Sequence, residues 1–194
     1  NMTLRARLTS VERLEGVLDI RSRSEHHQWA AGRLIAVGAG QVAPILSVDV
    51  GAAAGVKVGD RAIDDRGVVG RIRAVRPEAA EILPLTGPMS LVGFRGAISG
   101  AVGMINGDGS GGLVAIGVDP GQPPLIGEAL VSRTLESPLP EGIPIGFVRA
   151  LETEETTGRL LVWADPVRPV RQVGPMLIAI DPKRPKDTFS AVEA

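Results

Sequence analysis

The stretch VGDRAIDDRGVVGRIRAV, residues 58–75, contains two short apolar runs separated by the turn-forming residues DDRG. Short runs bounded by Asp and Gly are typical of β-strands joined by tight turns. The same alternation continues from residue 32 to residue 180, where further candidate strands are separated by segments such as GAAAG and DPGQPP. We therefore expect an all-β chain with barrel or sandwich architecture.

A second version of this pattern lies downstream. The aligned pairs are VGDRAI (58–63) with IGEALV (126–131), VVGRIRAV (68–75) with PIGFVRAL (144–151), and EILPLTGP (81–88) with RLLVWADP (159–166). The alignment predicts two small related β-barrels in tandem, over 31–96 and 97–182, and chance similarity between two strand-rich stretches is the alternative. Gly70 and Gly146 fall at matching positions, where we expect a bulge or a close backbone approach.

The first 30 residues have a different periodicity and predict an N-terminal helix, the end of a coiled coil. Their apolar residues recur at spacings of three and four, which places them on one helical stripe. An amphipathic helix packed on its own domain is the alternative. The stripe is a candidate for self-association and consists of Leu4, Leu8, Val11, Leu14 and Leu18. At the other end, residues 183–194 are charged and predict a mobile tail.

Composition excludes several functional classes. The chain has 194 residues, 44% hydrophobic residues and a net charge of −1, which is typical of a globular protein. It has no Lys/Arg cluster interleaved with aromatic residues, so nucleic-acid binding is disfavoured. It contains no cysteine, so thiolate chemistry and disulfides are excluded. No apolar run is long enough to span a membrane, and the abrupt start suggests a fragment whose natural beginning lies upstream.

The segment NGDGSGG, residues 106–112, is similar to the nucleophile loop of trypsin-type proteases and raises the question of whether Ser110 is catalytic. A serine nucleophile needs a base within hydrogen-bond reach. The only histidines, His26 and His27, belong to the predicted N-terminal helix, far from any barrel interior. Asn-Gly and Asp-Gly are instead strong hairpin signals, so Asn106, Gly107, Asp108 and Gly109 predict a turn. We predict no catalytic, metal-binding or cofactor-binding residues, and we expect Trp163 to lie in the core.

Four segments in order resemble the periplasmic region of the MreC family, the rod-shape-determining proteins of bacterial cell-wall elongation. They are residues 48–75, 83–94 (LPLTGPMSLVGF), 98–118 (ISGAVGMINGDGSGGLVAIGV) and 127–148 (GEALVSRTLESPLPEGIPIGFV). The chain departs from the family pattern at Gly87, where Asp is usual, and it lacks the aromatic residues common before the second strand. These departures put in doubt any aromatic contact surface carried over from the family.

The resemblance implies a non-enzymatic scaffold in the periplasm, anchored to the inner membrane by a segment upstream of Asn1. It further implies self-association and binding to the elongation penicillin-binding transpeptidase, to MreD and to other elongation proteins. The scaffold would favour an active transpeptidase conformation and so maintain the rod shape. A β-barrel module that binds a peptidoglycan saccharide or peptide is the alternative function.

Overall fold

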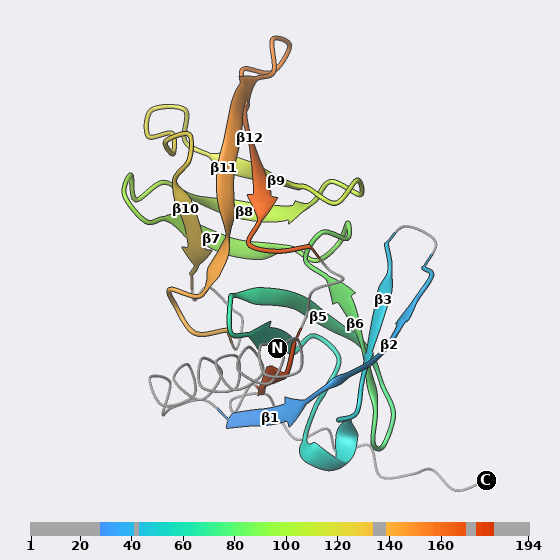
Figure 1. The fold of residues 1–194 in the computed structure, drawn as a ribbon. Coiled ribbons are helices and arrows are strands. Elements are labelled where there is room, and N and C mark those ends of the chain that lie inside the picture. The colour runs from blue at the N-terminus through green and yellow to red at the C-terminus, as the bar shows by residue number, and fades with distance from the viewer. Residues whose placement is uncertain (1–27, 41–42, 134–138, 170–173, 181–194) are drawn as a thin grey trace, which may run out of the picture.

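The computed structural model describes residues 28–40, 43–133, 139–169 and 174–180, which form two β-sheets (Figure 1). The first sheet is open and has seven strands; the second is closed into a six-stranded barrel. In spatial order the first sheet comprises β1 (Gln28–Gly32), β13 (Met176–Ile180), β4 (Arg61–Asp64), β5 (Val68–Val75), β6 (Ala80–Pro84), β3 (Ile45–Val48) and β2 (Leu34–Gly38). The barrel comprises β10 (Ala129–Ser132), β11 (Pro144–Thr153), β12 (Leu160–Pro166), β9 (Leu113–Val118), β8 (Val102–Gly107) and β7 (Val92–Gly96).

The all-β class is confirmed, but only one of the two predicted barrels is closed. The first sheet ends in β1 and β2, which do not pair with each other, so it curls without closing. The sole helical element of the described ranges is the 3₁₀ turn η1 (Ala52–Ala54). The predicted helix over 1–30 lies outside the described residues as far as residue 27, and residues 28–30 belong to strand β1. The tail over 183–194 also lies outside the described residues.

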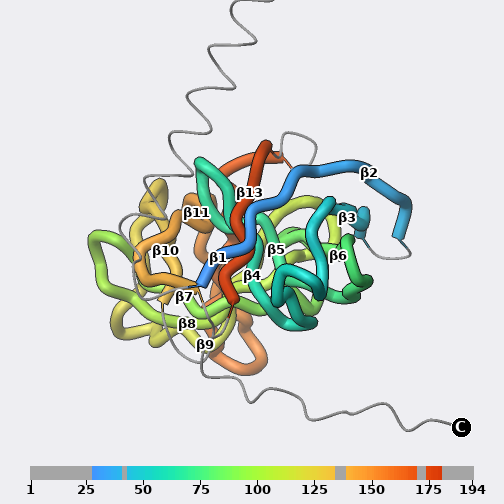
Figure 2. The backbone as a smooth tube through the Cα atoms, turned by 90° about the horizontal axis from the view of Figure 1, so that it is seen from below, coloured from blue at the N-terminus to red at the C-terminus, as the bar shows by residue number. Residues whose placement is uncertain are grey.

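Strand pairing divides the chain differently from the predicted ranges 31–96 and 97–182. Strand β7 falls inside the first predicted range, but it pairs with β8 and β10 and therefore belongs to the closed barrel. Strand β13 falls inside the second range, yet it lies between β1 and β4 of the first sheet (Figure 2). The chain therefore passes from the first sheet into the barrel and returns to the first sheet for its last described strand.

The two sheets repeat the same three-stranded unit, β4–β5–β6 in the first and β10–β11–β12 in the second. Gly70 and Gly146 occupy the same place in each unit, and the register shifts directly after the partner residue on the preceding strand in both. Their cross-strand partners are Ala62 and Pro84 for Gly70, and Leu130 and Pro166 for Gly146. The third predicted pair of segments is therefore misaligned, because EILP at 81–84 corresponds to WADP at 163–166 and not to residues 159–162.

Each sheet has its own apolar core, and the barrel core also takes residues from the first sheet. The first core contains Leu46, Ile72 and Ile82, all fully buried. The barrel core contains Phe94 and Ile105 among its buried residues. It extends over Ile63, Val68 and Leu177 of the first sheet and over Leu85, which directly follows β6. Because burial of a large aliphatic side chain stabilises by about 1.5–3 kcal/mol, this shared contact holds the two sheets together.

A buried ion pair joins the same two units. Arg168, which follows β12, forms ion pairs with Asp64 at the end of β4 and with Asp65. Asp64 also accepts hydrogen bonds from the backbone N–H groups of Arg66 and Gly67. Burial raises the pKa of Asp64, against the opposing attraction of the Arg168 guanidinium. The pair therefore supports relative placement of the sheets more than stability, since buried pairs recover little beyond their desolvation cost.

Candidate interaction surface

The glycine-rich segment of the closed barrel forms a hairpin loop with no catalytic geometry. Asp108 Oδ1 accepts the backbone N–H groups of Ser110 at 2.7 Å and Gly112 at 2.9 Å. Burial opposes ionisation of Asp108, but these N–H groups outweigh it and lower its pKa. Gly109 has a φ of 81°, which suits a residue without a Cβ. The loop is built around the Asp108 carboxylate, and Ser110 lies in it as an exposed turn residue.

Asn106 and Gly107 were predicted in the turn but lie on strand β8. The Asn106 side-chain oxygen accepts the backbone N–H of Ser90 at 2.9 Å. A Cβ on Gly107 would lie 2.0 Å from the carbonyl carbon of Thr86, which is too close for any side chain. Both residues therefore hold the linker between β6 and β7 against the barrel, a role that their sequence neighbours do not reveal.

A set of exposed apolar side chains lies on adjoining segments of the closed barrel. We call it the barrel patch, and it consists of Ile98, Leu125, Ile126 and Phe147, which are 75%, 53%, 70% and 49% exposed. Phe147 lies on β11 opposite Ala129 of β10. Gly127, next to Ile126, donates its backbone N–H to the Val148 carbonyl at 2.8 Å. The patch therefore draws on β11, the β7–β8 turn and the loop before β10.

The buried carboxylate of Glu128 holds these segments together. Its Oε1 accepts the backbone N–H groups of Ile98 and Ser99, the second at 2.7 Å, and its Oε2 accepts that of Leu125 at 2.7 Å. Burial raises the pKa of Glu128, but the three N–H groups and the Ser99 hydroxyl outweigh it and lower the pKa below the ordinary value of 4.5. The ionised carboxylate thus fixes two of the loops that carry the barrel patch.

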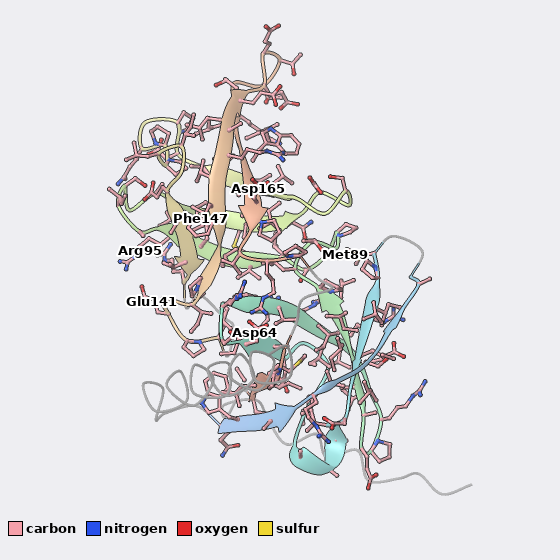
Figure 3. The ribbon with its side chains drawn as sticks, in the orientation of Figure 1. Asp64, Met89, Arg95, Glu141, Phe147 and Asp165 are labelled. Atoms are coloured by element: carbon pink, nitrogen blue, oxygen red, sulfur yellow. The ribbon has the colours of Figure 1, made fainter. Side chains whose placement is uncertain are left out.

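One ion pair joins β11 to β12 beside Phe147, and a second joins β7 to the loop before β11; Figure 3 labels Phe147, Asp165, Arg95 and Glu141. Arg149 Nη1 lies 3.3 Å from Asp165 Oδ1, and Asp165 is the cross-strand partner of Phe147. Arg95 Nη2 lies 3.7 Å from Glu141 Oε1. Both pairs are about half exposed, so they add little stability. An apolar centre with a charged, solvated rim is the usual anatomy of a protein–protein interface.

Trp163 was predicted to lie in the core, and this prediction is wrong. It is half-buried on the outer face of β12, and its indole Nε1 donates to Glu152 Oε2 at 2.9 Å. Its strand neighbours Val162 and Ala164 are the residues that point inward. An indole on the outer face with its N–H satisfied is consistent with the polar handle that this side chain carries.

Nothing within the described ranges assembles into a metal site of three or more His, Cys, Asp or Glu. No helix in that part of the chain has the length and apolar character needed to cross a membrane. The apolar stripe from Leu4 to Leu18, and His26 and His27, lie outside it. Within the described part of the chain, the barrel patch is the candidate surface for contact with a partner.

Comparison with known proteins shows to which family this chain belongs. The family model described as rod shape-determining protein MreC, barrel core, matches residues 34–179. The chain belongs to the MreC family. No curated protein sequence matches it significantly.

Solved MreC structures share the fold. One structure titled MreC has 23% identity and a TM-score of 0.77, with 90% of this chain and 99% of that chain covered. MreC from Pseudomonas aeruginosa has 24% identity and a TM-score of 0.70, with 78% and 98% covered. A third match is MreC in a complex with penicillin-binding protein PBP2 from Helicobacter pylori, at 11% identity and a TM-score of 0.61, with 80% and 99% covered. These similarities establish the shared fold.

Proposed function

We propose that this chain is a non-enzymatic periplasmic scaffold of the bacterial cell-wall elongation machinery, which binds the elongation penicillin-binding transpeptidase through the barrel patch. Membership of the MreC family supports the role in rod shape. A related structure is titled as the major periplasmic domain of MreC, which supports the location. The H. pylori structure is a complex of MreC with PBP2, which supports a transpeptidase partner.

The exposed aromatic ring of Phe147 is the observation that supports a contact on the barrel. Phe94 is fully buried in the barrel core, whereas Phe147 is 49% exposed. Aromatic side chains surrounded by rim residues dominate the binding energy of many interfaces. Phe147 lies beside Ala129 and the Arg149–Asp165 pair, so a partner can cover the ring while the charges stay at the edge.

Activation of the transpeptidase would follow from differential binding. A partner that binds one conformation of an enzyme more tightly shifts the population toward that conformation. A rigid patch favours such selectivity, and the Glu128 carboxylate fixes the loops on which two of its residues lie. The scaffold would therefore act on the transpeptidase without supplying a reacting group.

Self-association, membrane anchoring and contacts with MreD and other elongation proteins complete the proposal. The candidate stripe for self-association is Leu4, Leu8, Val11, Leu14 and Leu18, and the anchor would lie upstream of Asn1. Strand β2 offers a second route, because it is an edge strand on which Ile35 and Val37 are 59% and 48% exposed. Unpaired edges pair readily with other strands.

The test is titration of the cognate elongation transpeptidase, as its periplasmic domain, with the wild-type chain and with Phe147→Ala. We expect the variant to bind at least tenfold more weakly, because truncating an aromatic hot spot costs about 2 kcal/mol or more. The matched control is Ile116→Ala on strand β9, which is 50% exposed and lies outside the patch. The proposal fails if Phe147→Ala binds as tightly as wild type, or if both variants lose affinity equally.

A further inference from the structure

A groove on the first sheet, separate from the barrel patch, holds an arginine that has no counter-ion among the described residues. The groove has a volume of about 510 Å³. Its floor is formed by cross-strand neighbours on the sheet face opposite the core, and the linker between β6 and β7 forms its wall. The residues that line the groove include Ile45, Arg71, Arg73, Leu83, Pro88 and Met89.

The floor of the groove follows from strand register. Arg61 of β4 pairs with Arg71 of β5, and Arg71 pairs in turn with Leu83 of β6. The adjacent row, made of Ile72, Ile82 and Leu46, is fully buried in the first core. Side chains alternate between the two faces of a strand, so the row containing Arg71 faces outward. Two guanidinium groups are thereby placed side by side at one end of an apolar floor.

The two arginines have different surroundings. Arg61 donates to the carbonyl oxygens of Ser90 at 3.4 Å and of Leu91 at 2.6 Å, which are both in the linker. Burial and the positive charge of Arg71 lower the pKa of Arg61 to about 10. Arg71 makes no hydrogen bond or ion pair with any described residue, and the Nε atoms of both arginines are buried without a protein partner. A buried donor of a charged group is costly to leave unsatisfied, so a carboxylate that reaches Arg71 gains a charge-assisted hydrogen bond.

The other residues that line the groove indicate which kind of ligand would fit beside Arg71. Arg73 is already paired with Glu81, with Nε lying 3.3 Å from Oε2, whereas neither Arg61 nor Arg71 has a carboxylate partner among the described residues. Ile45, Leu83 and Pro88 make the remaining surface apolar. Met89 lies at the rim (Figure 3), is 74% exposed and has a φ of 76°, a conformation that non-glycine residues seldom adopt. Strained, exposed residues cluster at ligand sites.

We propose that this groove is a carboxylate-binding site for an acidic peptide segment, with Arg71 as the recognition residue. A guanidinium fork matches a carboxylate in shape and charge. Arg71 is the guanidinium left to bind one carboxylate, because Arg61 donates to two carbonyl oxygens of the linker and Arg73 is paired with Glu81. Ile45, Leu83, Pro88 and Met89 would contact the apolar side chains that flank the acidic residue. The site lies on the first sheet and does not depend on transpeptidase binding at the barrel.

The test follows the Arg71 Nε–Hε resonance by NMR while the chain is titrated with acetyl-Gly-Leu-Glu-Leu-Gly-amide. We expect a saturable shift of this resonance and at least about tenfold weaker binding of the Gln counterpart, since hydrogen bonds to charged groups are worth more than neutral ones. A peptide with its only carboxylate at the C-terminus, acetyl-Gly-Gly-Leu, distinguishes a terminal from a side-chain carboxylate. Saturable binding of either peptide supports the site.

Variants assign the binding to Arg71. Arg71→Gln should lose at least tenfold in affinity, and Arg159→Gln, an exposed arginine near the β11–β12 turn, should bind as wild type. Ala39→Glu places a competing carboxylate at the exposed rim and should weaken binding even if Arg71→Gln fails to fold. Absence of any shift at millimolar peptide, equal binding of the Gln peptide, or displacement by inorganic phosphate at lower concentration than by acetate would overturn the proposal.

Discussion

At the scale of single residues, Glu128 shows how one buried side chain organises a surface. Glu128 is 2% exposed, and its two oxygens accept N–H groups from loops on either side of the barrel patch. The equivalent residue of the repeated unit, Asp60, accepts the Lys57 N–H in the same way at 2.8 Å. The repeat thus conserves an acidic residue at the start of β4 and β10 that closes the preceding turn.

Replacing Glu128 should destabilise the barrel. Glu128→Ala leaves three N–H groups without their acceptor and should lower the free energy of unfolding by about 3 kcal/mol or more. Glu128→Gln keeps one acceptor oxygen and should cost about half as much. Urea denaturation of the three proteins at neutral pH measures both changes. An unfolding free energy within about 0.5 kcal/mol of wild type for Glu128→Ala would contradict the role given to this carboxylate.

The lowered pKa of Glu128 also predicts a pH dependence. Because the folded-state pKa lies below the ordinary value of 4.5, the carboxylate contributes its full stability above that pH and loses it as pH falls through the folded-state pKa. The difference in unfolding free energy between wild type and Glu128→Gln should therefore shrink as pH is lowered from 6 to about 3. Comparing the two proteins at each pH cancels the titration of the other carboxyl groups. A constant or growing difference would contradict the assignment.

Gly70 and Gly146 allow a second prediction at this scale. A Cβ on Gly146 would lie 2.3 Å from the Asp165 carbonyl oxygen, and one on Gly70 would lie 2.1 Å from that of Leu83. Gly70→Ala and Gly146→Ala should each destabilise by about 2 kcal/mol or more, because the facing strand must move. The control is Gly38→Ala on edge strand β2, where the nearest atom lies at 3.9 Å. Equal stability of all three variants in thermal unfolding would argue against close strand contact at these glycines.

At the scale of strands and turns, the sequence predicts the local elements but not which distant strands pair with each other. The turns at DDRG and GDGSGG are visible because Asp and Gly determine turn geometry locally. The return of β13 to the first sheet could not be predicted from local sequence, because Ile178 pairs with Ala30 and Ala62, which lie more than a hundred positions earlier. Whether a sheet closes is decided by such distant pairings. The structure differs for this reason from the predicted closure of the first barrel (31–96) and from the predicted boundary at residue 96.

The same limit applies to the faces of apolar strands. The run LLVWA, residues 160–164, contains no polar residue to mark which side faces outward. Trp163 therefore suggested a core position, although it lies on the outer face. Phe147 was not singled out from the sequence, although Arg149 two residues later marks the exposed face, and the bulge between Val148 and Ala150 changes the alternation directly after it. A polar residue within LLVWA would have shown which face of that run is exposed.

At the scale of the whole molecule, the chain forms one body with two separate outer surfaces. The shared core around Ile63 and Leu177, together with the Arg168 pairs to Asp64 and Asp65, joins the open sheet to the barrel. The barrel patch lies on the closed sheet, and the groove around Arg71 lies on the open one. This arrangement suits a protein that holds partners in fixed relation rather than one that transforms a substrate.

The most direct test of this account is hydrogen–deuterium exchange of the wild-type chain with and without saturating cognate transpeptidase. Slowed exchange should centre on residues 125–131 and 144–149 and on the β7–β8 turn, because these segments carry or adjoin the barrel patch. Arg71 and its neighbours on β5 should exchange at unchanged rates. Protection confined to the first sheet, with the segments around Phe147 and Ile126 unaffected, would contradict the claim that the closed barrel binds the transpeptidase.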